Sequence, residues 1–138
     1  MNAMTDDELT EIIIGCAYKV HNTLGSGFLE KVYRKSLAIE VAKKGLKVEQ
    51  EASIQVFYEG QIVGEYFADL LIENRVIAEL KAVQGLLREH EVQLVNYLAA
   101  TGLDSGLLIN FAASVQVKRK YRTYKSKQAN PVHLVNPV

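Results

Sequence analysis

The 138-residue sequence has one cysteine, two prolines and no tryptophan, and its 16 Lys and Arg residues are balanced by 16 Asp and Glu residues. A single cysteine cannot form an internal disulfide, which excludes a disulfide-stabilised scaffold. The balanced charge creates no overall field towards nucleic acid or an anionic membrane, so any such attraction must be local. No segment approaches the ~18 consecutive apolar residues of a membrane-spanning helix.

The lack of a signal peptide and the scarcity of cysteine bear on the cellular compartment of the protein. The acidic start, MNAMTDDELT, lacks the basic and apolar segments of a signal peptide. The one cysteine, Cys16, lies among apolar residues, which is typical of a buried thiol in a reducing compartment. We therefore expect a cytoplasmic protein that does not associate with membranes.

The residues that are present are those of an ordinary folded protein, with 49% hydrophobic and 23% charged residues. The length suits one compact domain and is short for two. No internal repeat, low-complexity segment or linker interrupts the chain. We expect a single domain over residues 1–138, in which 125–138 form a less certain tail.

The apolar pattern predicts a mixed α/β fold. Helical spacing, with glycines at the ends, predicts helices over about 5–24 and 28–44. The β-branched and aromatic residues of 52–83 predict three antiparallel strands. A third helix is expected over about 86–102, and SGLLINF at 105–111 predicts an interior strand because it is apolar on both faces. The result is a four- to five-stranded mixed sheet flanked by helices.

Charged residues occur where the second and third strands should meet a core. If residues 73–75 form a three-residue turn, Asp69 lies opposite Glu79. Lys81 then shares their face, because it lies two residues beyond Glu79. A two-residue turn would shift the register by one and separate the two carboxylates. Two buried carboxylates call for a cation or a metal ion, whereas at a solvated strand end they would form only a weak surface ion pair.

Two helices carry further polar candidates. Glu30 shares a helix face with Tyr33, which should point inwards, although Glu30 could equally be an exposed first-turn acid favoured by the helix dipole. In the third helix Glu89, Gln93 and Tyr97 are four residues apart and form a polar stripe. Such stripes are usually solvent-facing, so these residues alone do not establish a site.

These motifs together resemble a known family. GFLEKVY has the form G-x-x-E-x-x-Y that names a family of small bacterial and archaeal proteins, and AD, AELKA and QLVNY, in this order, resemble the site of the PD-(D/E)XK nuclease superfamily. The resemblance implies a restriction-endonuclease-like αβββαβ core. Ala68 stands where the superfamily name has proline.

The resemblance also implies roles for individual residues. Glu30 corresponds to the helix acid, Asp69 to the second-strand acid and Glu79 with Lys81 to the E-x-K pair. The further correspondences are Gln93 as a catalytic residue of the following helix and Tyr33, Tyr97 and His21 as supporting residues.

A metal-dependent hydrolysis of DNA or RNA phosphodiesters is the implied activity. Mg²⁺ or Mn²⁺ would suit Asp69, Glu79 and the carbonyl of Leu80, because these hard cations prefer oxygen ligands. Lys81 would position water or stabilise the transition state, and Glu30 would orient Lys81 or hold a second metal ion. Gln93 would orient Lys81 or the phosphate, since an amide does not titrate. A homodimer is a further possibility that the resemblance raises.

One segment is locally basic. VKRKYRTYKSK holds six Lys or Arg residues between 118 and 127 with interleaved tyrosines, a pattern that can track phosphates and stack on unpaired bases. Lys118, Arg119, Lys120 and Arg122 are the predicted nucleic-acid contacts. The alternative is a solvated strand followed by a frayed end.

Two other functions stay open at this point. The chain could be a binding or assembly module that keeps a nuclease fold without useful turnover, because fold does not establish activity. Nucleophilic catalysis by Cys16 with His21 or His90 is less favoured, because Cys16 lies on the apolar side of its helix. The three histidines lack the spacing of a zinc site.

Overall fold

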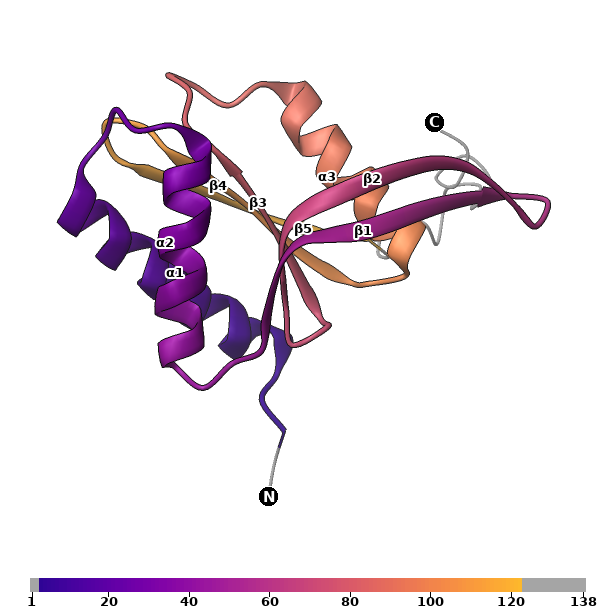
Figure 1. Cartoon of the computed structure of the whole chain (residues 1–138), viewed down its shortest axis with the longest axis horizontal. Coiled ribbons are helices and arrows are strands. Elements are labelled where there is room, and N and C mark those ends of the chain that lie inside the picture. The colour runs from indigo at the N-terminus through magenta and orange to yellow at the C-terminus, as the bar shows by residue number, and fades with distance from the viewer. Residues whose placement is uncertain (1–2, 123–138) are drawn as a thin grey trace.

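The structure is a computed structural model that describes residues 3–122, so the expected tail of 125–138 lies outside the described residues. Its elements follow the predicted order (Figure 1). They are α1 (Asp6–Leu24), α2 (Glu30–Lys43), β1 (Val48–Tyr58), β2 (Gln61–Ile72), β3 (Val76–Lys81), α3 (Arg88–Thr101), β4 (Ser105–Phe111) and β5 (Val115–Tyr121). Within the described part of the chain no helix is long and apolar enough to cross a membrane.

Helix α1 begins as its sequence predicts. The Thr5 hydroxyl accepts a hydrogen bond from the Glu8 N–H, and the Glu8 carboxylate accepts one from the Thr5 N–H, which completes a capping box. Helix α2 differs from the prediction, because it starts at Glu30 instead of Phe28. Leu29 has an extended backbone and no side-chain cap, so no capping residue fixes the start of α2.

The five strands form one mixed sheet in the order β1-β2-β3-β4-β5. Only the β3–β4 pair is parallel, since α3 forms the crossover between these strands. Every residue of β4 is buried, which confirms its predicted interior position. The mixed α/β fold with a helix-flanked sheet is thus confirmed.

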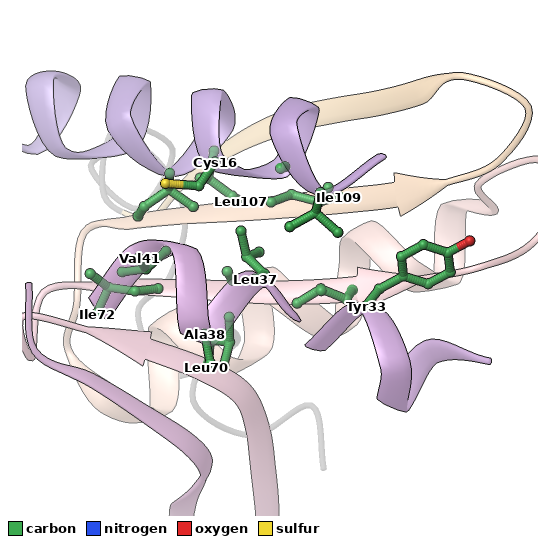
Figure 2. Packing of buried hydrophobic residues seen from close by; sticks show 14 of the residues in the cluster. Cys16, Tyr33, Leu37, Ala38, Val41, Leu70, Ile72, Leu107 and Ile109 are labelled. Atoms are coloured by element: carbon green, nitrogen blue, oxygen red, sulfur yellow. The ribbon is translucent and has the colours of Figure 1, made fainter. Parts of the chain in front are cut away.

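Helices cover both faces of the sheet. α1 and α2 bury apolar residues against β2, β3 and β4, and Figure 2 shows Leu37 and Val41 of α2 packed among Leu70, Ile72 and Leu107 of the sheet. α3 packs on the other face, where Leu94 and Leu98 meet Ile77 and Leu108. The region of β3 that carries the E-x-K motif therefore lies between two apolar layers.

Strands β1 and β2 change the layer they contact halfway along their length. Leu70 packs with α1 and α2, yet Ala68 packs with α3, although strict alternation would place both on one face. The change occurs where Glu51 has a left-handed φ of 52° and where Glu51 and Asp69 are missing from the strand ladder. The strands bend at this point, which is where Asp69 projects.

Gly106 allows α3 to pack closely on β4. A Cβ atom at this position would lie 2.9 Å from Leu94 Cδ1 in the closed core. We expect Gly106→Ala to lower the free energy of unfolding by about 1 to 3 kcal/mol, because overpacking forces side chains out of their rotamers. Urea denaturation measures this change.

A matched glycine provides the control for Gly106→Ala. Gly15 lies in α1, and nothing stands within 4 Å of a Cβ built there. Gly15→Ala should raise the free energy of unfolding by about 0.5 to 1 kcal/mol through helix propensity. Equal effects of the two substitutions would contradict a close contact at Gly106.

Candidate active site

The predicted turn and register between β2 and β3 are confirmed. Glu73 and Asn74 have left-handed φ values of 55° and 54°, and the Arg75 N–H donates to the Ile72 carbonyl at 2.9 Å. Ile72 therefore pairs with Val76, and the ladder continues to Leu70 and Ala78. Asp69 and Glu79 occupy the next opposed positions, where the ladder ends.

Two reciprocal hydrogen bonds replace the strand ladder at this point. The Asp69 N–H donates to Glu79 Oε2 at 2.8 Å, and the Leu80 N–H donates to Asp69 Oδ2 at 2.7 Å. Each carboxylate thus reaches across the opening between β2 and β3 and binds the backbone of the opposite strand. The two carboxylates are neighbours, as the register predicts.

Burial makes this pair electrostatically costly. Glu79 is only 5% exposed. Burial, with a further contribution from the Asp69 charge, raises the pKa of Glu79 to about 8. Burial also raises the pKa of Asp69, against the hydrogen bond from Leu80 and the charge of Lys81. Among residues 3–122, no ion pair neutralises either carboxylate.

The donor set fits a hard divalent cation. Asp69 and Glu79 each use one oxygen in the reciprocal hydrogen bonds, and within the described residues no buried side-chain oxygen lacks a partner, so the other oxygens reach solvent. The N–H and C=O of a strand residue point to the same side, so the Leu80 carbonyl faces β2 as its N–H does. Two carboxylate oxygens and a carbonyl suit Mg²⁺ or Mn²⁺, which keep several waters.

Glu30 and Lys81 lie near this pair. Glu30 is exposed at the start of α2, and partial burial raises its pKa while the charges of Lys81 and Asp69 act on it in opposite directions. In the described part of the chain, no three His, Cys, Asp or Glu side chains form a group that could hold a metal ion. The structure therefore gives no support to Glu30 as a ligand of a second metal, and its remaining expected role is to orient Lys81.

Gln93 and Tyr97 come from α3 and line a groove between α3 and the β1–β2 hairpin. Tyr97 is 7% exposed, and burial, with the charges of Glu79 and Asp69 adding to it, raises its pKa to about 12. Tyr97 therefore lines the groove and also lies near the carboxylate pair, since it clusters with Ile77 on the face of β3 that carries Glu79. Gln93 is exposed one helical turn away from Tyr97.

Tyr33 binds the backbone of the loop before α2. The ring is fully buried and stacks on Phe111 with centroids 4.5 Å apart. Its hydroxyl donates to the Gly25 carbonyl at 2.6 Å and accepts a hydrogen bond from the Phe28 N–H at 3.3 Å. These bonds hold the loop that precedes Glu30, and a supporting role of Tyr33 in the site stays a prediction.

His21 lies against the turn between β4 and β5. Its Nε2–H donates to the carbonyl of Ala112 at 2.9 Å, and its ring stacks on Phe111. The contacts of His21 are therefore with this turn and not with the carboxylates. A supporting role in the site stays a prediction.

The four basic residues of β5 and its end are all engaged by acids. Lys118 and Lys120 pair with Glu91 of α3, whereas Arg119 pairs with Glu11 of α1. Arg122 pairs with Asp104. Phosphate would have to compete with these acids, so contact of these residues with nucleic acid stays a prediction.

The structure does not favour Cys16 as a nucleophile. The thiol is 3% exposed, and burial raises its pKa, so the reactive thiolate is disfavoured. His21 is bound to Ala112, and the Leu87 N–H donates to His90 Nδ1 at the start of α3. Neither histidine is therefore arranged to activate the thiol.

Sequence reasoning missed Asn110, which is fully buried on β4. Its side chain accepts a hydrogen bond from the Val83 N–H at 3.0 Å and donates to the Val83 carbonyl at 2.9 Å and to Gln116 Oε1 at 2.8 Å. Asn110 pairs with Lys81 in the sheet, so these bonds fix the chain directly after Lys81. The signal in the sequence was the single asparagine within the otherwise apolar end of SGLLINF, because a buried amide needs hydrogen-bond partners.

Asn110→Ala should lower the free energy of unfolding by about 2 to 4 kcal/mol, because it leaves both backbone groups of Val83 without their partner. Gln116→Ala is the control, since Gln116 is exposed and loses only one hydrogen bond. Its effect should stay near 1 kcal/mol or below. Urea denaturation compares the two, and equal losses would argue against the Asn110–Val83 contact.

Comparison with known proteins places the chain in a family. The model of the PD-(D/E)XK nuclease superfamily matches residues 7–123. No curated protein shows a significant match to the sequence.

Two solved structures share the fold. The crystal structure of SSO0001 is 20% identical over 94% of this chain, with a TM-score of 0.56, and this chain spans 64% of its length. An alkaline exonuclease from Laribacter hongkongensis is 12% identical over 97% of this chain and 78% of its own, with a TM-score of 0.53. At these identities the likeness concerns the fold, whereas the superfamily model covers most of the sequence. The chain belongs to the PD-(D/E)XK nuclease superfamily.

Proposed function

We propose that this chain is a divalent-metal-dependent nuclease that hydrolyses phosphodiester bonds of DNA or RNA at the Asp69–Glu79 pair. The observation that carries the proposal is the burial of Glu79 against Asp69, with no ion pair to either carboxylate among residues 3–122. Keeping both carboxylates ionised in this arrangement costs several kcal/mol unless a cation joins them. The G-x-x-E-x-x-Y spacing of Gly27, Glu30 and Tyr33 further supports a place in the family of that name.

In this proposal Asp69, Glu79 and the Leu80 carbonyl hold Mg²⁺ or Mn²⁺. The bound ion supplies a water of lowered pKa and offsets negative charge on the phosphoryl oxygens. The reciprocal hydrogen bonds keep both carboxylates in place before the ion arrives, so binding requires little reorganisation.

The other residues act on the substrate or on one another. Lys81 places an ammonium group beside the acids, where it stabilises the anionic transition state. Glu30 orients Lys81, since their charges interact. Gln93 donates its amide to a phosphate oxygen or to Lys81, because it can form hydrogen bonds without changing protonation.

Cleavage assays with and without a chelator test the proposal. Labelled single-stranded DNA, double-stranded DNA and RNA are incubated with Mg²⁺, Mn²⁺ or EDTA, and cleavage is expected only with a metal ion. Calorimetric Mn²⁺ titration of the same preparation should show binding. Metal binding without cleavage of any of these substrates would instead identify a binding or assembly module.

A further inference from the structure

A groove of about 410 Å³ lies between α3 and the β1–β2 hairpin. Its uncharged lining residues are Val56, Tyr66, Val92, Gln93, Asn96 and Tyr97. A volume of this size falls in the usual range for pockets that hold a single small molecule.

The chemistry of the groove suits an aromatic ligand with polar edges. The rings of Tyr66 and Tyr97 lie 5.7 Å apart at 44°, so they offer π-faces, and Val56 and Val92 add apolar wall. The amide of Asn96 carries donors and an acceptor, so it can pair with the edge of a nucleobase.

The charges of the groove argue against a phosphate as its occupant. Arg88 and Glu89, one cation and one anion, are the charged residues among those that line it. They give no net attraction for a phosphate, whereas base stacking on aromatic rings needs no net charge. A nucleobase therefore fits the groove better than the sugar–phosphate backbone of a nucleic acid does.

Tyr97 connects the groove with the carboxylate pair, because it packs in one cluster with Ile77, which shares a face of β3 with Glu79. Tyr97 lines the groove, and the charges of Glu79 and Asp69 act on its hydroxyl. Tyr66 also lines the groove and lies three residues before Asp69 on β2. A nucleotide whose base occupies the groove would thus have its sugar–phosphate next to the carboxylates.

We propose that this groove binds one unpaired nucleobase beside the phosphodiester bond to be cut, which makes single-stranded nucleic acid the substrate class. A paired base cannot enter, because its ring is stacked and its Watson–Crick edge is occupied in the duplex. The substrate class rests on the proposed nuclease function, but binding of a base can be measured without cleavage.

The test uses a single-stranded oligonucleotide of about a dozen nucleotides, within the range of known single-strand sites, with one 2-aminopurine moved along it. In EDTA, binding to the wild-type chain should quench the fluorescence at one position, because that base stacks in the groove. Tyr66→Ala should abolish the quenching and weaken binding about 5- to 100-fold. The same strand in a duplex should bind at least about tenfold more weakly than the single strand.

Two variants control for loss of folding. Asn96→Ala changes a half-buried helix residue, and it should weaken binding severalfold while the thermal unfolding midpoint stays unchanged. Tyr58→Ala removes an exposed tyrosine near the hairpin tip and should bind as the wild type does. Quenching at no position, duplex binding as tight as single-strand binding, or equal binding by Tyr66→Ala and Tyr58→Ala would each overturn the proposal.

Cleavage in Mg²⁺ or Mn²⁺ separates this inference from the proposed function. Quenching that depends on Tyr66, without cleavage of any substrate, leaves the base site standing and rejects the nuclease. Cleavage of duplex and single strands at equal rates, without quenching, rejects the base site and leaves the nuclease standing.

Discussion

Asp69→Asn should lower nuclease activity by about 100-fold or more and abolish Mn²⁺ binding. Removing a metal ligand costs several kcal/mol of transition-state stabilisation, and each 1.36 kcal/mol corresponds to a tenfold change in rate. The asparagine oxygen can still accept the hydrogen bond from the Leu80 N–H, so the strands should stay joined. Cleavage rates and calorimetric titration measure the two effects.

Glu65→Gln is the matched control for Asp69→Asn. Glu65 is an exposed acid on the same strand, with a long hydrogen bond from the Ser53 hydroxyl. Its loss of charge should leave cleavage and Mn²⁺ binding unchanged. Wild-type activity in Asp69→Asn would refute the assignment of Asp69, and loss of activity in both variants would indicate a general charge effect.

Glu79→Gln should make the metal-free protein more stable than the wild type at pH 8, but not at pH 5. The folded-state pKa of Glu79, about 8, lies above the value of ~4.3 for an unfolded chain. Between these values the folded state keeps a proton that the unfolded chain has lost. The free energy of unfolding therefore falls as pH rises, by at most about 1.4 kcal/mol per pH unit.

Asp69 adds to this trend in the same direction, because its pKa is raised too. Glutamine does not titrate, and its oxygen can still accept from the Asp69 N–H. The expected gain of Glu79→Gln at pH 8 in EDTA is about 2 to 4 kcal/mol. Urea denaturation across pH 5 to 8 measures it, with Glu65→Gln as the control.

In saturating Mn²⁺ at pH 8, the wild type should have a higher free energy of unfolding than Glu79→Gln, the reverse of the order in EDTA. In the proposed function the ion would bind the folded wild type and stabilise it by mass action, whereas Glu79→Gln would lack a ligand. In EDTA, the free energy of unfolding of the wild type should fall relative to that of Glu79→Gln between pH 5 and 8. If it does not fall, Glu79 is ionised over this whole range. The pH argument would then be wrong, although Asp69 and Glu79 could still bind metal.

The features that local sequence determines were predictable. The capping box fixed the start of α1, and two residues able to adopt a left-handed backbone between β2 and β3 fixed the register that brings Asp69 to Glu79. The periods of 3.6 and 2 residues were sufficient to predict the element order.

Features that depend on distant partners were not predictable. The bend at Glu51 and Asp69 arises from packing against two different layers, which no local pattern encodes. The acids that pair with Arg119, Asp7 and Glu11, come from a helix about 110 residues earlier in the chain. Only the assembled fold shows that this basic strand is already neutralised.

The two backbone amides that bridge β2 and β3 make the site observable without any substrate. In an ordinary ladder the N–H protons of Asp69 and Leu80 would face carbonyl oxygens, but here they face carboxylates that titrate. Their chemical shifts and their exchange with deuterated solvent should therefore follow the ionisation of the pair. An NMR spectrum of the resting protein would contain two built-in reporters of the charge on the Asp69–Glu79 pair.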